Sequence, residues 1–266
     1  MKPLAIVIPI YKQVLTGTEE ISFRQTLRVL GKHPIIMVCP ESLNIAAYNI
    51  IATDYNISLQ IESFKDEYFK NIAGYNRLLL SMVFYQRFAT YQYILIAQLD
   101  AYVFSDSILQ WCAKGYDYIG SPLFGAQMNI NRATVGNGGL SLRRVEAYIN
   151  YFNGDKHVIP CKKIASRINV SAKPYTRWLV WLLMIIGWRN TPCQCAKHYK
   201  YNEDLFWSQY LNGTNYELNK PSVIEAAEFA WERFPSELYA QLGHLPFGCH
   251  AWEKNEYELF WRNYIK

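Results

Sequence analysis

Short, uninterrupted apolar runs near the start of the chain constrain its fold more than any other sequence feature. Residues 4–11 and 34–39 are such runs, and 93–97 is a third. Runs of about four to eight apolar residues are typical of strands that are buried on both faces of a parallel sheet. The chain is therefore expected to build its core around such a sheet.

The segments between these runs complete an alternating pattern. Residues 57–62 alternate apolar and polar side chains, which predicts a shorter strand. Apolar residues at helical spacing predict helices at 19–30, with Gly31 as the stop, and at 67–88. The order strand, helix, strand, strand, helix, strand predicts an α/β fold with a mostly parallel central sheet flanked by helices.

The composition narrows the class of protein. Of the 266 residues, 51% are hydrophobic and 16% are aromatic, which is enough for a sizeable core. The net charge of +5 is far from the dense basic stripe of a dedicated nucleic-acid binder, so no nucleic-acid partner is expected. The six Cys lack Cys-x-x-Cys spacing, and no cleavable signal peptide is expected before the first apolar run. Free thiols and a cytoplasmic location are therefore expected.

Two side chains follow predicted strands at positions where parallel sheets bind ligands. Tyr11 and Asp100 lie at the carboxyl ends of the runs 4–11 and 93–97, and ligands bind beside such ends. The Asp100 carboxylate is a hard oxygen ligand of the kind that Mg²⁺ and Mn²⁺ prefer, and such a cation can hold a diphosphate. The alternative is an aspartate that caps the turn after the strand.

Three glycines in four positions distinguish residues 136–139, which are predicted to form a loop that opens into a helix. Glycine permits positive φ angles and a close approach of ligands to the main chain. The backbone around Asn137, Gly138 and Gly139 could therefore hold sugar hydroxyl groups. The alternative is a tight turn between a strand and a helix.

Two further segments carry residues that can act on protons or metals. Glu203 and Asp204 open a predicted helix at 202–207, and one of them could remove a proton from an acceptor hydroxyl. The alternative is an acidic first turn that complements the helix dipole. His250 can supply a neutral nitrogen to a metal ion, with His244 as the substitute candidate, and a structural histidine is the alternative.

Residues 154–200 have the character of an insertion. It contains eleven uncharged residues at 178–188, between Arg177 and Arg189, which are too few to span a bilayer. Trp residues at the edges and flanking Lys and Arg residues are typical of a helix that lies in a membrane interface. That interpretation predicts peripheral contact with the inner face of the cytoplasmic membrane, and a helix buried in the core is the alternative.

Four motifs, taken in order, resemble those of a family of bacterial glycosyltransferase-like proteins. They are Gln98-x-Asp100 after a buried strand, Gly-Asn-Gly-Gly-x-Ser-Leu-Arg at 136–143, Asn-Glu-Asp-x-Phe-Trp at 202–207 and Pro-Phe-Gly-Cys-His at 246–250. Many members are described only as a domain of unknown function, and they occur with capsule or lipopolysaccharide assembly genes. The resemblance covers roughly residues 55–255 and skips the insertion.

The same order is similar to that of metal-dependent galactosyltransferases of the GT-A type. This resemblance implies one GT-A-like domain over 1–266, with a nucleotide-binding half at 1–105 and an acceptor half at 106–266. It implies that Asp100 and His250 bind Mn²⁺ or Mg²⁺ and that Asp204 or Glu203 is the catalytic base. Gln98 replaces the first acid of the Asp-x-Asp motif in those enzymes.

The predicted function is the transfer of a sugar, with inversion, from a nucleotide-diphosphate sugar to a glycan or lipid-linked glycan acceptor in surface polysaccharide synthesis. A UDP-sugar is the favoured donor. Tyr11 is expected to stack on the base, and the donor or acceptor is expected to contact Gln98, Asn137, Gly138 and Gly139. The rivals are a retaining mechanism, a non-catalytic glycan- or membrane-binding protein on a decayed transferase fold, and a metal-dependent phosphoesterase.

Overall fold

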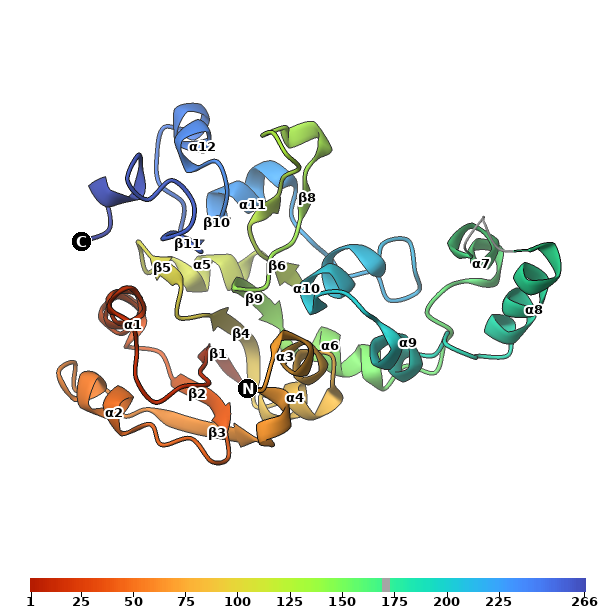
Figure 1. The fold of residues 1–266 in the computed structure, drawn as a ribbon, viewed down its shortest axis with the longest axis horizontal. Coiled ribbons are helices and arrows are strands. Elements are labelled where there is room, and N and C mark those ends of the chain that lie inside the picture. Colours follow the sequence, from red (N-terminus) through yellow and green to blue (C-terminus); the bar gives the residue numbers. More distant parts are fainter. Residues whose placement is uncertain (169–172) are drawn as a thin grey trace.

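A six-stranded sheet runs through the middle of the molecule (Figure 1), in the strand order β3-β2-β1-β4-β9-β6. The computed structural model describes residues 1–168 and 173–266. The strands are β1 (Lys2–Pro9), β2 (Ile35–Pro40), β3 (Gln60–Phe64), β4 (Tyr91–Ala97), β6 (Tyr118–Ile119) and β9 (Leu140–Arg144). The first four are parallel to one another, and β9 runs antiparallel to both β4 and β6.

Helices cover both faces of this sheet, because successive side chains of a strand point to opposite faces. The flanking helices are α1 (Gly17–Leu30), α2 (Ala46–Thr53), α3 (Ile72–Leu79), α4 (Met82–Arg87), α5 (Ile108–Ala113) and α6 (Val145–Phe152). Ile6 and Leu95 pack with α1, α2 and α5 on one face. Val7 and Ile96 pack with α3, α4 and α6 on the other. The predicted α/β fold with a mostly parallel sheet flanked by helices is confirmed.

Smaller elements follow the ends of the central strands. A three-stranded sheet has the order β10-β11-β5, and β7 pairs with β8. Their bounds, with those of the last helices, are β5 (Ala101–Val103), β7 (Pro122–Leu123), β8 (Thr134–Val135), α10 (Glu203–Leu205), α11 (Val223–Phe229), β10 (Ala230–Trp231), α12 (Pro235–Leu242) and β11 (Gly248–His250). β11 is antiparallel to β5, so a late segment of the chain returns to the end of β4.

Two predicted helices differ in the structure. The single helix predicted at 67–88 is wrong, because α3 and α4 are separate. The side chains of Asn71 and Ser81 accept hydrogen bonds from the backbone N–H groups of Gly74 and Phe84, and each thereby begins a new helix. The helix predicted to open directly from the glycine-rich loop is also wrong, because β9 follows the loop. The predicted third strand begins three residues later than expected, at Gln60.

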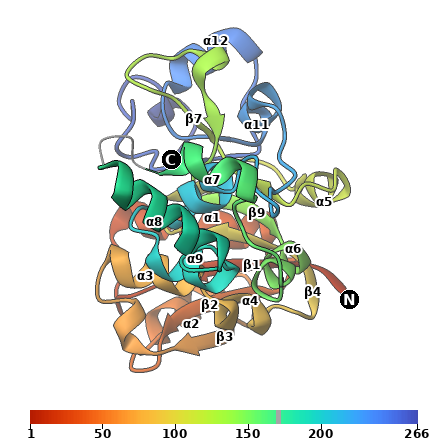
Figure 2. The same cartoon turned by 90° about the vertical axis from the view of Figure 1, so that its right-hand side faces the viewer.

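In the described part of residues 154–200, the predicted insertion, the chain forms the helices α7 (Cys161–Arg167), α8 (Pro174–Ile185) and α9 (Pro192–His198). Figures 1 and 2 show α7 and α8 at the outer end of the molecule, beyond α9 and away from the central sheet. Met184 is the one buried residue of α8, whereas Trp178 and Leu179 are exposed. The run 178–188 is therefore only partly a core helix, because Met184 packs into the core while Trp178 and Leu179 face solvent.

Candidate functional site

A cavity of about 680 Å³ lies at the carboxyl ends of β1 and β4. Tyr11 follows β1, and Gln98 and Asp100 follow β4, so three of the predicted site residues line the same cavity. Parallel neighbouring strands end at one edge of a sheet, which is why residues almost ninety positions apart meet here. The cavity is the physical setting that the sequence prediction required.

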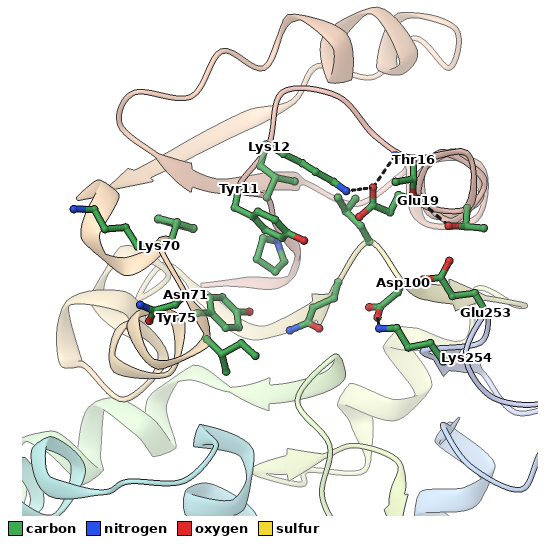
Figure 3. A pocket seen from close by; sticks show the side chains of 17 residues that line it. Tyr11, Lys12, Thr16, Glu19, Lys70, Asn71, Tyr75, Asp100, Glu253 and Lys254 are labelled. Atoms are coloured by element: carbon green, nitrogen blue, oxygen red, sulfur yellow. Dashed lines mark hydrogen bonds and ion pairs between the residues drawn. The ribbon is translucent and has the colours of Figure 1, made fainter.

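The two sides of this cavity differ in chemistry. Figure 3 shows Tyr11, Asn71 and Tyr75 on one side and Asp100 and Lys254 on the other. The first side offers aromatic rings and an amide, which suit a flat heterocycle. The second offers opposite charges around one point. A ligand with a planar group at one end and a charged group at the other would match both sides.

Asp100 and His250 are in direct contact, as predicted for shared metal ligands. His250 Nε2 lies 3.1 Å from Asp100 Oδ1 and 3.3 Å from Gln98 Oε1. The register between β11 and β5 explains the contact, because His250 pairs with Ala101, the residue after Asp100. On the other ring nitrogen, His250 Nδ1 lies 3.7 Å from Glu232 Oε1. The imidazole is thus held between two carboxylates.

Burial and the neighbouring charges shift the pKa values of Asp100 and His250 in opposite directions. Burial raises the pKa of Asp100, but the hydrogen bond and charge of His250, with the charge of Lys254, outweigh it and lower that pKa to about 2. Burial disfavours the charged form of His250, but the hydrogen bond to Asp100 and the negative charges of Asp100 and Glu232 outweigh it and raise the pKa of His250 to about 9. At neutral pH the metal-free pair is therefore an imidazolium beside a carboxylate.

The donor set of this cluster fits a divalent cation. Neighbouring ligands of an octahedral ion with bonds of about 2.1 Å lie about 3 Å apart. The spacings of His250 Nε2 from Asp100 Oδ1 and from Gln98 Oε1 are close to that value. Within the described residues, no group of three His, Cys, Asp or Glu could hold a metal ion. The third donor would be the amide oxygen of Gln98, and Glu232 would orient the imidazole.

The glycine-rich loop lies against this cluster. Asn137 has a φ of 60°, and its side-chain oxygen accepts a hydrogen bond from Gly139 N. A Cβ added to Gly139 would lie 2.0 Å from His250 Nε2, so only glycine lets the loop approach the imidazole. The amide nitrogen of Asn137 donates to Glu232 at 2.5 Å. The loop and the histidine are therefore held by the same carboxylate.

The loop also joins the cluster to the acidic doublet. Gly138 N donates a hydrogen bond to Asp204 Oδ2 at 3.1 Å, and Leu205 N donates to Asp204 Oδ1 at 2.7 Å. Gly138 thus lies beside Asp204, and Gly139 lies beside His250. Asp100, the glycine-rich loop, Asp204 and His250, which are far apart in sequence, therefore lie close together.

Glu203 is held in a buried ion pair. Its carboxylate receives two hydrogen bonds from the guanidinium of Arg143, at 2.8 and 3.0 Å, and both side chains are buried. Arg143 Nη1 also donates to the Tyr85 hydroxyl. Because this pair holds Glu203 away from solvent, Glu203 is less accessible to a ligand than Asp204, and the choice of base between the two acids stays a prediction. Asp204 is half-buried and remains the candidate base.

Sequence reasoning missed several residues that complete the site. Lys12 directly follows Tyr11, so the strand-end argument could have included it, and its Nζ lies 2.7 Å from Glu19 Oε2. Lys254 follows His250 by four positions and lies 3.4 Å from Asp100 Oδ2. Glu232 carries no local signal, because only the fold brings it to His250.

The profile of a family described as "Protein of unknown function (DUF5672)" matches residues 58–250. No curated protein matches the chain. Among solved structures, the glycosyltransferase GlyE of Streptococcus pneumoniae TIGR4 is 12% identical, with 94% of this chain and 55% of that chain covered and a TM-score of 0.46. Core-mannan synthase A from Aspergillus fumigatus, in an Mn/GDP form, is 9% identical, with 84% and 78% covered and a TM-score of 0.45.

Structures of S. aureus TarS are also similar. The complex of TarS 1-349 with UDP-GlcNAc is 13% identical, with 55% of this chain and 46% of that chain covered and a TM-score of 0.35. The chain spans slightly less than half the length of the TarS 1-349 structures that it matches. These likenesses are distant in both sequence and structure.

Proposed function

The chain belongs to the DUF5672 family, and we propose that it is a metal-dependent glycosyltransferase of the GT-A type that uses a nucleotide-diphosphate sugar. One observation carries this proposal. At the edge of the cavity, Asp100 contacts His250, and His250 lies against Gly139 of the glycine-rich loop, while the preceding Gly138 is hydrogen-bonded to Asp204. A cation ligand pair, a side-chain-free surface and a carboxylate base are the parts that sugar transfer needs.

The cavity supports a nucleoside diphosphate as the donor's common part. Tyr11 is 62% exposed, and its ring faces the cavity, where it can stack on a base opposite Tyr75. Asp100 and Lys254 lie across the cavity, where the diphosphate would be held. A divalent cation bound by Asp100, His250 and Gln98 would offset the negative charge that develops on the leaving diphosphate.

The chain's own residues then account for the transfer step. The open main chain at Gly138 and Gly139 lets a sugar ring lie close to the cluster. Asp204 accepts the proton of an acceptor hydroxyl as that oxygen bonds to the anomeric carbon. The bond from that carbon to the diphosphate breaks, and the nucleoside diphosphate leaves. A single displacement of this kind inverts the anomeric configuration.

The order of the four sequence motifs supports the finer assignments. By that resemblance, the donor is a UDP-sugar, and the acceptor is a glycan or lipid-linked glycan of surface polysaccharide synthesis in the cytoplasm. Residues 1–105 would bind the nucleotide, and 106–266 would shape the acceptor site.

A screen of nucleotide sugars tests the proposal. UDP-glucose, UDP-galactose, UDP-GlcNAc and GDP-mannose are added with Mn²⁺ or with EDTA, and the thermal midpoint is recorded. A donor at 100 times its Kd stabilises the native state by about 2.7 kcal/mol. We expect Mn²⁺-dependent stabilisation by one nucleotide class, its loss in Asp100→Asn, and its retention in Asp155→Asn, which alters an exposed carboxylate away from the cavity.

The product decides the reaction class. Proton NMR of a donor that binds, incubated with candidate acceptors, should show a new glycosidic bond with inverted anomeric configuration. A retained configuration would contradict the single displacement. Release of free sugar without acceptor would indicate a phosphoesterase or hydrolase. If every donor that binds does so equally well with Mn²⁺ and with EDTA, the proposed cation site is overturned.

A further inference from the structure

The outward face of α8 is apolar. Tyr175, Trp178, Leu179, Leu182 and Ile186 recur at the spacing of one helix face, where residues three and four apart are neighbours. Trp178 is 62% exposed, Leu179 is 51% exposed and Ile186 is 76% exposed. A helix at the surface of a water-soluble protein normally turns polar side chains toward the solvent. This face carries none between Tyr175 and Ile186.

The opposite face anchors the helix to the protein. Met184 is buried in the core cluster that covers one face of the central sheet, and Val180, Trp181 and Ile185 pack against it. From Trp178 to Ile185 the helix is therefore apolar all round, yet only one side is covered. A helix of this composition is normally enclosed on all sides, so the uncovered side is suited to a second apolar environment.

The charged residues around the helix are all basic. Residues 156–202 contain nine of the chain's 27 Lys and Arg and none of its 22 Asp and Glu. Among the residues that the structure describes, no ion pair includes a member of this segment. The rest of the chain carries more acids than bases, so the basic excess of the protein lies entirely in the segment that presents the apolar face.

The length of α8 decides how such a helix can meet a membrane. Its 12 residues extend about 18 Å, well short of a hydrocarbon core of about 30 Å. None of the described helices combines the length and the hydropathy that crossing a bilayer requires. A short helix with Trp residues, an apolar face and flanking cations lies along the interface.

We propose that the α7–α8 segment, here residues 161–168 and 173–189, docks the protein on an anionic lipid surface. Tyr175, Trp178, Leu179 and Ile186 enter the boundary between headgroups and acyl chains, while Lys162 and Lys173 contact lipid phosphates. A second copy of the chain is disfavoured as the occupant, because two such faces would bring like charges together. The proposal does not depend on sugar transfer, since docking is measured without substrate.

Vesicle flotation of the full chain tests this docking. Vesicles of phosphatidylglycerol with phosphatidylcholine are compared with phosphatidylcholine alone, at 0.1 and 0.5 M NaCl. We expect flotation with the anionic vesicles that weakens at high salt. Trp178→Ser/Leu179→Ser should lower the partition coefficient at least tenfold. Its matched control is Ile224→Ser/Leu259→Ser, which alters two equally exposed apolar residues elsewhere and should leave partition unchanged.

A charge series separates lipid binding from general stickiness. Each Lys or Arg near an anionic surface strengthens binding about fivefold, so Lys162→Gln/Lys173→Gln should weaken it about 25-fold. The control Lys65→Gln/Arg77→Gln, which removes the same charge elsewhere on the surface, should change it less than twofold. Equal flotation with both vesicle types, or equal effects of test and control variants, would overturn the proposal. A dimer in light scattering that Trp178→Ser/Leu179→Ser dissolves would assign the face to a second copy and would also overturn it.

Discussion

The strand-end cavity and the α7–α8 segment depart from the usual distribution of residues in opposite directions. Beside the cavity, charged groups are buried and paired, as in the Arg143–Glu203 ion pair and the contact of His250 with Asp100. On α8, apolar side chains such as Trp178 are exposed. Buried polar groups and exposed apolar patches are the informative departures, because ordinary folding needs neither.

The two regions therefore differ in the kind of ligand that each can bind. Charges held away from water act strongly on a charged ligand that enters beside them. An apolar face that is left open gains free energy only when something apolar covers it. Substitutions that act on one region and leave the other unchanged therefore sharpen this comparison.

The largest effect is expected from Asp204→Asn. Loss of a general base lowers kcat by about 10²–10⁴-fold, while donor affinity stays nearly constant because Asp204 is not among the residues that line the donor cavity. Initial rates and calorimetric donor binding on the same preparation check both parts. An active Asp204→Asn enzyme would remove Asp204 from the mechanism.

Removing the buried guanidinium should have the next largest effect. Arg143→Met leaves Glu203 buried without its partner, which lowers the free energy of unfolding by about 3–5 kcal/mol. Arg262→Met, in an exposed pair with Glu258, should leave stability nearly unchanged. Urea denaturation measures both. The double variant Arg143→Met/Glu203→Met should recover much of the loss, and failure to do so would show that charge pairing is not the cause.

A methyl group at the glycine-rich loop should act on the cluster alone. Gly139→Ala places a Cβ 2.0 Å from His250 Nε2 and must displace the imidazole or the loop. We expect at least a tenfold loss of Mn²⁺-dependent donor affinity, which is about 1.4 kcal/mol. Gly125→Ala is the control, because no atom lies within 4 Å of the added Cβ. Unchanged donor affinity in Gly139→Ala would separate the loop from the metal site.

The smallest effect is expected on α8. Trp178→Ser/Leu179→Ser should change the free energy of unfolding by no more than about 0.5 kcal/mol, since both side chains face solvent. Met184→Ala, on the buried face, should lower it by about 2–5 kcal/mol. A large loss in the surface variant would mean that the outward face supports the fold, and the contrast between the two regions would fail.

The regular part of the fold follows from local sequence. The strands β1, β2 and β4 are predicted correctly because short uninterrupted apolar runs are typical of strands that are buried on both faces of a sheet. The prediction of one helix at 67–88 failed because it relied on the apolar periodicity and overlooked two N-cap residues. Asn71 and Ser81 are both good N-cap residues, and each begins a helix there.

The candidate site shows where local sequence stops being informative. Asp100 and Tyr11 could be placed from strand ends alone. The adjacent acids Glu203 and Asp204 are equivalent in sequence, and only Arg143, 60 positions away, distinguishes them. His250 reaches Asp100 through the register of β11 against β5, which no periodicity predicts. Glu232 is found only from the structure.

The central claim is that Asp100 and His250 hold a divalent cation together with a nucleoside diphosphate. Electron paramagnetic resonance of free Mn²⁺, during titration of the intact protein with UDP or GDP present, measures this directly. We expect one Mn²⁺ bound per chain with one of the two nucleotides, and weak or no binding in Asp100→Asn at the same concentrations. Equal Mn²⁺ binding by the intact protein and Asp100→Asn, or no nucleotide-dependent binding in either, would contradict it.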